Sequence, residues 1–308
     1  MNQYSPQADT DRTQPLSIRL LEKLLFPSRI LSCKEKQRLA HDIAGKTILI
    51  TGASYGIGEQ LAYLLANLTT SDNRQNEQLQ PVKLVLVGRT TEKLEQVQAH
   101  IHQTNASASI YPIDLRDDES LERFIQFLQT LSIDIFINNA GQSIMRSVMD
   151  SLERGHDYER TISLNYIAPV KLCLGLIPQL GINQGHIINV SALNVLLPPM
   201  PKWSAYQASK SAFDQWFRSV SPELYAQKIT TSTLYLPLVR TRMIAPTAIY
   251  QSAPTMTTEQ VAALISRLII HKKTSFKPWW LYPVEILALL FKRPLEFCVR
   301  SYYRYQLR

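Results

Sequence analysis

Tyr206 and Lys210 form a pair of polar side chains four residues apart, a spacing that stacks them on one face of a helix. A phenol near an ammonium group is suited to general acid catalysis, because the positive charge stabilises the phenolate and lowers the pKa of the tyrosine. We therefore predict that Tyr206 gives a proton to a reacting oxygen and that Lys210 lowers its pKa. The same spacing arises by chance in many helices, so the assignment needs a second motif.

Residues 51–58, Thr-Gly-Ala-Ser-Tyr-Gly-Ile-Gly, provide that second motif. They follow the apolar stretch 47–50, which we expect to be a buried strand, and precede 59–68, whose leucines have helical spacing. A glycine turn between strand and helix binds phosphate, because backbone N–H groups point at the ligand and glycine lets the chain approach it closely. The predicted dinucleotide-binding residues of this turn are Gly52, Ser54, Tyr55, Gly56, Ile57 and Gly58.

Taken in this order, the two motifs resemble those of the short-chain dehydrogenase/reductase family, over about residues 44–270. Asp114, Asn139 and Asn165 also match the family pattern. The resemblance implies that Asp114 contacts the adenine, that Asn139 binds the adenosine side of the cofactor, and that Asn165 anchors a water in a proton relay. It also implies that Lys210 holds the nicotinamide ribose. Taken singly, Asp114 is equally suited to capping a helix and Asn139 to a turn.

Arg89 follows the second expected strand, at the point where an acidic residue would bind a free adenosine ribose. A guanidinium there matches a 2′-phosphate, and Ser54 can add a hydroxyl. The cofactor is therefore predicted to be NADP(H). The alternative is a surface arginine that opens a helix.

The position of the family's catalytic serine departs from the pattern. Counted from Asn189, that position is Ala192, and the interval from there to Tyr206 is one residue longer than usual. Either Ser191 or Ser204 faces the substrate instead, or the site works without this donor, whose loss typically costs about 10²–10³ in rate. We take Ser191 as the fourth catalytic candidate, with Tyr206, Lys210 and Asn165.

The segment after the last expected strand, together with residues 155–161, is similar to bacterial fatty acyl-CoA reductases of the short-chain dehydrogenase type. The resemblance places Val239 and Thr241 at the nicotinamide carboxamide, although Pro237 stands where glycine is usual. It implies reduction of a lipophilic carbonyl, with fatty acyl-CoA to fatty aldehyde as the leading case. The alternatives are another lipophilic ketone or alcohol, or a weakened, membrane-associated NADP(H)-binding protein.

Alternating apolar strands and amphipathic helices predict an α/β fold, a Rossmann-type doubly wound parallel sheet. A helix around 158–176 should be kinked at Pro169, a capping box at Thr257 and Gln260 should start a helix to about residue 270, and 69–81 should form a surface loop. The expected strands are 47–50, 83–87, 110–113, 133–137, 185–190 and 229–235.

The 308 residues fit one domain, 44–270, with amphipathic extensions at both ends. In the N-terminal extension, 1–43, we expect residues 1–15 to be disordered, without the apolar region of a signal peptide, and 16–31 to form a basic amphipathic helix. The C-terminal extension, 271–308, carries a net charge of +6 together with many aromatic and aliphatic residues.

That composition fits peripheral contact with an anionic membrane, and it fits equally a tail packed on its own domain or on a second subunit. We expect no nucleic-acid partner, because no such motif accompanies the basic residues. The three cysteines are unclustered, which indicates a reducing compartment and no metal site. The predicted location is the cytoplasm, with peripheral contact at the inner face of the membrane, and the predicted assembly is a homodimer or homotetramer.

Overall fold

A computed structural model of the chain describes residues 15–27, 30–68, 79–244, 250 and 252–306. The start predicted to be disordered and most of the expected loop 69–81 lie outside the described residues.

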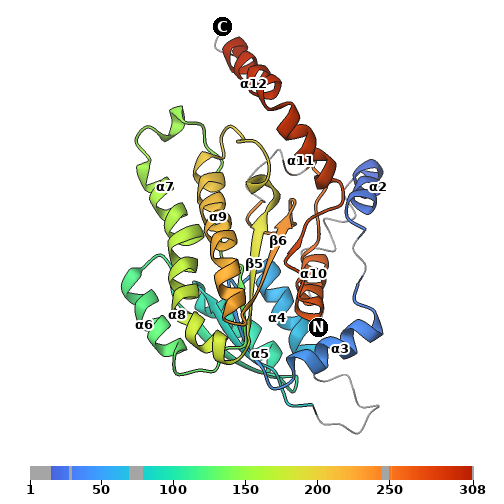
Figure 1. The fold of residues 1–308 in the computed structure, drawn as a ribbon, viewed down its shortest axis with the longest axis vertical. Helices are drawn as coiled ribbons and strands as arrows, with labels where there is room; N and C mark the ends of the chain where they lie inside the picture. Colours follow the sequence, from blue (N-terminus) through green and yellow to red (C-terminus); the bar gives the residue numbers. More distant parts are fainter. Residues whose placement is uncertain (1–14, 28–29, 69–78, 245–249, 251, 307–308) are drawn as a thin grey trace.

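Seven parallel strands form one sheet in the order β3-β2-β1-β4-β5-β6-β7 (Figure 1). The strand order reverses between the paired strands β1 and β4, so the connections that follow them lead in opposite directions and leave a binding crevice at their carboxyl ends, as in doubly wound sheets. The predicted fold class is thereby confirmed. The strands are β1 (Thr47–Thr51), β2 (Lys83–Gly88), β3 (Ser107–Pro112), β4 (Ile135–Asn138), β5 (His186–Ala192), β6 (Thr230–Leu236) and β7 (Ser275–Phe276).

Helices cover both faces of the sheet and bury two separate apolar clusters. On one face pack α3 (Cys33–Ile43), α4 (Gly56–Leu68), α5 (Thr91–Ile101) and α10 (Thr258–His271). On the other face pack α6 (Asp118–Leu128), α8 (Ala168–Ile182) and α9 (Ser204–Ala226), with α7 (Gly155–Ile162) against α9. Both faces of β1 are covered, which is why its residues read as one unbroken apolar run.

The irregularity predicted at Pro169 takes the form of a π-helical segment, Ser163–Ile167, between α7 and α8. The N–H of Ala168 bonds to the carbonyl of Ser163, and Pro169 lies in the first turn of α8. Proline has no N–H to donate to the carbonyl four residues earlier, so the regular series of α-helical hydrogen bonds is interrupted at this point. The continuous run 155–182 is apolar and long enough to span a membrane, but 44% of its most apolar window is buried inside the protein, as in a core helix.

The extensions are more ordered than the composition suggests. α3 contributes buried Leu39 and Ile43 to the core, and β7 adds a strand beyond the predicted boundary at residue 270. The predicted helix 16–31 is shorter, because α2 (Leu16–Leu25) ends before Phe26 turns into the core. After β7 come α11 (Leu281–Leu290) and α12 (Lys292–Gln306), which project from the end of the molecule toward which β5 and β6 point (Figure 1).

Candidate active site

The glycine turn joins the carboxyl end of β1 to the N-terminus of α4. Gly52 and Gly56 have φ values of +68° and +63°, which disfavour any residue with a side chain. A Cβ on Gly58 would lie 2.4 Å from the carbonyl oxygen of Gly52, so this glycine is needed for helix and strand to pack closely. Asn139 supports the turn from β4, since its Nδ2 donates to the carbonyls of Thr51 and Gly52 at 2.9 and 3.2 Å.

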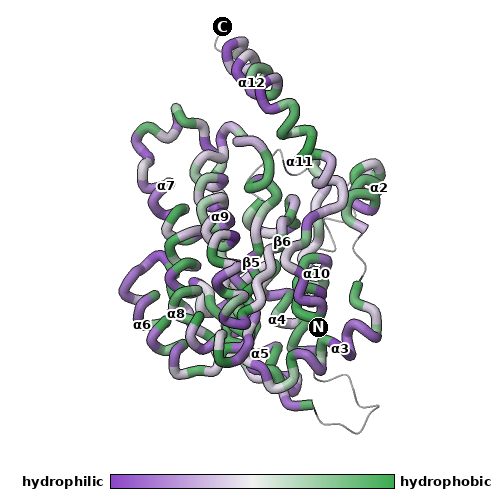
Figure 2. The backbone as a smooth tube through the Cα atoms, in the orientation of Figure 1, coloured by the Kyte–Doolittle hydropathy of each residue, from purple (hydrophilic) through white to green (hydrophobic). Residues whose placement is uncertain are grey.

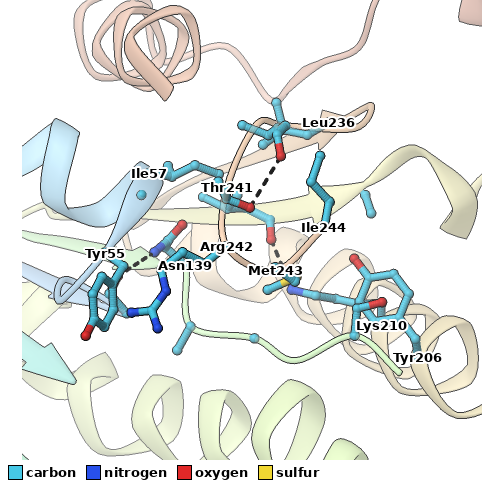
Figure 3. Close-up of a pocket in the computed structure, with 18 of the residues that line it drawn as sticks. Tyr55, Ile57, Asn139, Tyr206, Lys210, Leu236, Thr241, Arg242, Met243 and Ile244 are labelled. Carbon is cyan, nitrogen blue, oxygen red and sulfur yellow. Dashed lines mark hydrogen bonds between the residues drawn. The ribbon is translucent and has the colours of Figure 1, made fainter. Parts of the chain in front are cut away.

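A cavity of about 500 Å³ runs from this turn to helix α9. Figure 3 shows Tyr55, Asn139 and Arg242 on one side of it and Tyr206 with Lys210 on the other. Most residues predicted from the sequence line this cavity: Gly52, Ser54, Tyr55, Gly56, Ile57, Arg89, Asn139, Ser191, Tyr206, Lys210, Val239 and Thr241. Gly58, Asp114 and Asn165 are not among the lining residues.

Tyr206 and Lys210 lie on the same face of α9, as the spacing predicts (Figure 3). Their electrostatics differ from the prediction. Burial raises the pKa of Tyr206, and the nearby phenol of Tyr250 raises it further. Burial also lowers the pKa of Lys210 to about 8, and its Nζ donates to the carbonyl of Val190 at 3.2 Å. The predicted lowering of the pKa of Tyr206 is therefore wrong for this structure, because loss of solvation dominates and disfavours the phenolate.

Asn165 occupies the π-helical segment, which turns its amide toward the loop after β4. Its Oδ1 accepts from the N–H of Gln142, and its Nδ2 donates to the carbonyl of Gln142 and to Ser209 Oγ, each at 2.9 Å. A Cβ on Gly141 would lie 3.3 Å from Asn165 Oδ1 and 3.4 Å from Lys210 Nζ. The side chains of Asn165 and Lys210 thus flank one glycine, although Asn165 itself stays behind the cavity wall.

Arg89 directly follows β2, and Ser54 of the glycine turn packs against Gly88, the last residue of that strand. Arg89 is exposed at the edge of the cavity. Ser54 is buried, and among the described residues its Oγ has no hydrogen-bond partner. Asp114, expected at the adenine, is engaged by Arg116, whose N–H and Nε both donate to Asp114 Oδ1 at 3.0 Å. These bonds hold the pKa of Asp114 below its usual value, and the charge of Arg89 contributes to this effect.

Of the two serines proposed to replace the missing one, only Ser191 reaches the cavity. Ser191 lies in β5, is 4% exposed, and has an Oγ without a hydrogen-bond partner in the described part of the chain. Ser204 is exposed at the start of α9, and its Oγ lies 2.9 Å from the hydroxyl of Tyr158. Ala192, at the usual position, also lines the cavity but carries no donor.

Aromatic and aliphatic residues that the motif analysis did not single out line the cavity beside Tyr206. Trp203 packs against Tyr250, with ring centroids 5.9 Å apart. Arg242 lies over the ring of Tyr55, at 4.1 Å from the centroid. Tyr55 belongs to the glycine turn and Arg242 directly follows the predicted contact Thr241, whereas the sequence analysis assigns no role to Trp203 or Tyr250. The other apolar residues of this wall are Leu193, Met200, Leu236, Leu238, Met243 and Ile244.

The residues present fit a nicotinamide dinucleotide. Two glycines with positive φ leave room for phosphates at a helix N-terminus, the orphaned Ser54 hydroxyl and Arg89 offer donors at one end, and Lys210 offers an ammonium group at the other. Within the described residues, no three His, Cys, Asp or Glu side chains gather as a metal site.

Comparison with known proteins agrees with this geometry. A sequence model of the family described as short chain dehydrogenase matches residues 46–250. A fatty acyl-CoA reductase of Acinetobacter baylyi is 42% identical over 234 residues, 75% of each chain. A fatty acyl-CoA reductase of Mycobacterium tuberculosis is 40% identical over 224 residues, 72% of each chain. Among solved structures, a short-chain dehydrogenase from Sphingobium yanoikuyae in complex with NADPH matches with a TM-score of 0.66 and 22% identity, over 85% of this chain and 96% of that one.

Proposed function

Because the chain belongs to the short-chain dehydrogenase family, we propose that it is an NADP(H)-dependent reductase of lipophilic carbonyl compounds, with fatty acyl-CoA as the leading substrate. The observation that carries the proposal is one cavity that joins a dinucleotide-binding turn, the Tyr206 and Lys210 pair, and an apolar wall. Two relatives that are at least 40% identical bear the name fatty acyl-CoA reductase, which supports the substrate class.

In this proposal the bound cofactor supplies a hydride, and the protein orients the carbonyl and handles the proton. Tyr206 donates a hydrogen bond to the carbonyl oxygen and gives it a proton as charge develops. With a thioester this gives a hemithioacetal, whose carbon–sulfur bond then breaks, and the hydroxyl proton passes to the sulfur to leave the aldehyde and the CoA thiol. The raised pKa of Tyr206 keeps the phenol protonated, so it is ready to act as a donor. Lys210 binds the nicotinamide ribose, and Asn165, held by Gln142 and Ser209, positions the relay water behind it.

Ser191 is proposed as the second donor to the carbonyl oxygen. Its hydroxyl is buried at the cavity wall and has no hydrogen-bond partner among the described residues, which suits a group whose partner is the substrate. Ser191→Ala should then lower kcat by about 10²-fold, the typical cost of one such donor, and leave NADPH affinity unchanged. Ala192→Ser should change kcat little, because the place of the donor is already taken.

The preference for NADP(H) is proposed to depend on Arg89. Arg89 and Ser54 both line the cavity, and a guanidinium and a hydroxyl without a partner among the described residues both suit a 2′-phosphate. Solved structures of the same fold that contain NADP or NADPH support this choice.

The substrate is tested by comparing NADPH oxidation with long-chain acyl-CoA, short-chain acyl-CoA, a long-chain aldehyde and a bulky lipophilic ketone. We expect the highest kcat/KM with long-chain acyl-CoA and release of free CoA with the aldehyde. Activity confined to the ketone would show that the protein is a reductase of lipophilic ketones and not of acyl-CoA. Tight NADPH binding without turnover of any of these compounds would favour the binding-protein alternative.

A further inference from the structure

The outer face of α2 is unusually apolar for a surface helix. Leu16, Leu20 and Leu24 lie one turn apart on that face and are 71%, 59% and 62% exposed. Arg19 and Lys23 are also exposed and lie along one edge of this row. A leucine row bordered by cations is typical of a helix that lies in a membrane interface.

The opposite face of α2 is fixed to the loop beside the cavity. Glu22 Oε1 accepts from Arg240 Nη2 at 3.1 Å, from the N–H of Thr255 at 2.9 Å and from Thr255 Oγ1 at 3.0 Å. Both side chains of the ion pair are mostly buried, with 17% and 15% exposed. Arg240 directly follows Val239, which lines the cavity, so α2 is a built part of the active-site end.

A second apolar helix, α11, lies at the same end of the molecule. Its first residue, Leu281, is fully buried, whereas Ile286, Leu289 and Leu290 are 61%, 77% and 69% exposed. The helix has one charged side chain, Glu285, which pairs with Lys277. Pairing this carboxylate lowers the cost of bringing the helix against a hydrocarbon surface.

Helix α12 continues outward from α11 and adds positive charge. It carries Lys292, Arg293, Arg300 and Arg304 against a single acidic residue, together with exposed Phe297. Along the long axis of the molecule, α2, α11 and α12 all lie toward the end to which β5 and β6 point (Figure 1), and Figure 2 shows hydrophobic residues along α2 and α11. The carboxyl ends of β5 and β6 line the cavity, so this apolar and basic face and the active site share one end.

Such a face could bind a second copy of the chain or a membrane, and its charge distinguishes between these two partners. A second copy of the chain would bring one tail of net charge +6 against another, and like charges across an interface oppose association. An anionic bilayer offers hydrocarbon to the leucines and phosphate groups to the cations, so each basic residue near its surface favours binding. We propose that α2, α11 and α12 form a docking face for an anionic bilayer.

Docking would place the cavity at the membrane surface, where a long-chain substrate resides, and the contact of Glu22 with Arg240 would link the position of α2 to the cavity loop. The enzyme would then take its substrate directly from the bilayer. This route of substrate entry rests on the proposed function, whereas the docking itself does not.

The test is co-flotation of the full chain with vesicles of phosphatidylcholine, alone or mixed with phosphatidylglycerol. The variant Leu20→Glu/Leu24→Glu is compared with Ile182→Glu/Tyr225→Glu, which adds the same charge at residues 83% and 81% exposed near the ends of α8 and α9, at the opposite end of the molecule. Wild type should float with the anionic vesicles and detach at about 1 M salt, where the Debye length falls to about 3 Å. The α2 variant should bind at least about tenfold more weakly, and the control variant should match wild type.

NADPH affinity of each variant checks that the fold is intact, because the cofactor side of the cavity does not contact the mutated leucines. The proposed docking face would be refuted if wild type stayed unbound to anionic vesicles at low salt. It would also be refuted if the control variant lost as much vesicle binding as the α2 variant. An α2 variant that only converts a dimer to a monomer in sedimentation, with vesicle binding unchanged, assigns the face to a second copy and also overturns it. Vesicle binding without acyl-CoA reduction would leave docking intact and refute the proposed substrate alone.

Discussion

Arg89 is the residue on which cofactor preference should depend. If its guanidinium binds the 2′-phosphate, wild type should bind NADPH at least about tenfold more tightly than NADH, a difference of about 1.4 kcal/mol. Arg89→Ala should remove most of that preference and leave NADH affinity nearly unchanged. Dissociation constants from quenching of protein fluorescence give the comparison, with Arg123→Ala on α6 as a surface control. Equal affinities in wild type would refute this role.

From the lowered pKa of Lys210 we predict that cofactor binding depends on pH. In the free protein burial lowers its pKa to about 8 from an ordinary value of 10.5, so the ammonium group loses its proton as pH rises through about 8. NADPH affinity should therefore fall between about pH 7 and pH 9, because the charged form binds the cofactor better. Lys210→Met should bind weakly with a flat profile. A flat profile in wild type would contradict the assignment.

The lowered pKa of Lys210 also makes the free energy of unfolding depend on pH. Since the folded state disfavours the ammonium form, Lys210 lowers the free energy of unfolding below about pH 8, and this cost disappears as pH rises toward 10.5.

At the residue scale, the sequence predicts which groups meet but not how they titrate. Tyr206 and Lys210 follow from their spacing, whereas the direction of the pKa shift of Tyr206 depends on burial among residues distant in the chain, including Tyr250. In the sequence, the role of Asp114 is likewise open to two interpretations, an adenine contact or a helix cap, and neither includes its pairing with Arg116. Ser191 could be separated from Ser204 only in three dimensions.

At the scale of elements, the pairing of Glu22 with Arg240 should contribute measurably to stability. Glu22→Gln keeps an oxygen for Thr255 but removes the charge facing Arg240, so we expect the free energy of unfolding to fall by about 1–3 kcal/mol. The matched control is Glu119→Gln, whose ion pair with Arg123 is exposed at 85% and 66% and should cost about 0–1 kcal/mol. Urea unfolding measures both. Equal costs would show that α2 is only loosely attached to the cavity loop.

The elements of the central domain could be predicted because their local signals agree. Apolar runs mark the buried strands, and the capping box at Thr257 and Gln260 starts α10 as expected. The strand ends differ by up to three residues, as in β3, which begins at Ser107 rather than residue 110, because its first three residues alternate two exposed serines with the small buried Ala108 and show no apolar run. For the π-helical segment Ser163–Ile167 the local signal is Pro169, which predicts a kink but not its form, and the contact of Asn165 with Gln142 is not visible in the sequence.

At the scale of the whole molecule, the two extensions flank the active-site end and α3 and β7 belong to the core. Composition alone could not reveal this, since the attachment of α2 depends on Glu22 meeting Arg240, more than 200 residues away in the chain. The predicted homodimer or homotetramer and the cytoplasmic location stay predictions. The docking face and the cavity together suggest a reductase that works at the boundary between lipid and water.

The central claim is hydride transfer to a long-chain acyl-CoA with Tyr206 as the proton donor. Wild type and Tyr206→Phe are each incubated with palmitoyl-CoA and NADPH deuterated at both positions of nicotinamide C4, and the products are identified by mass spectrometry. We predict that wild type forms palmitaldehyde carrying one deuterium at its carbonyl carbon, and that Tyr206→Phe binds NADPH with nearly wild-type affinity but forms almost no aldehyde. Absence of labelled aldehyde with wild type, or substantial formation with Tyr206→Phe, would contradict this account.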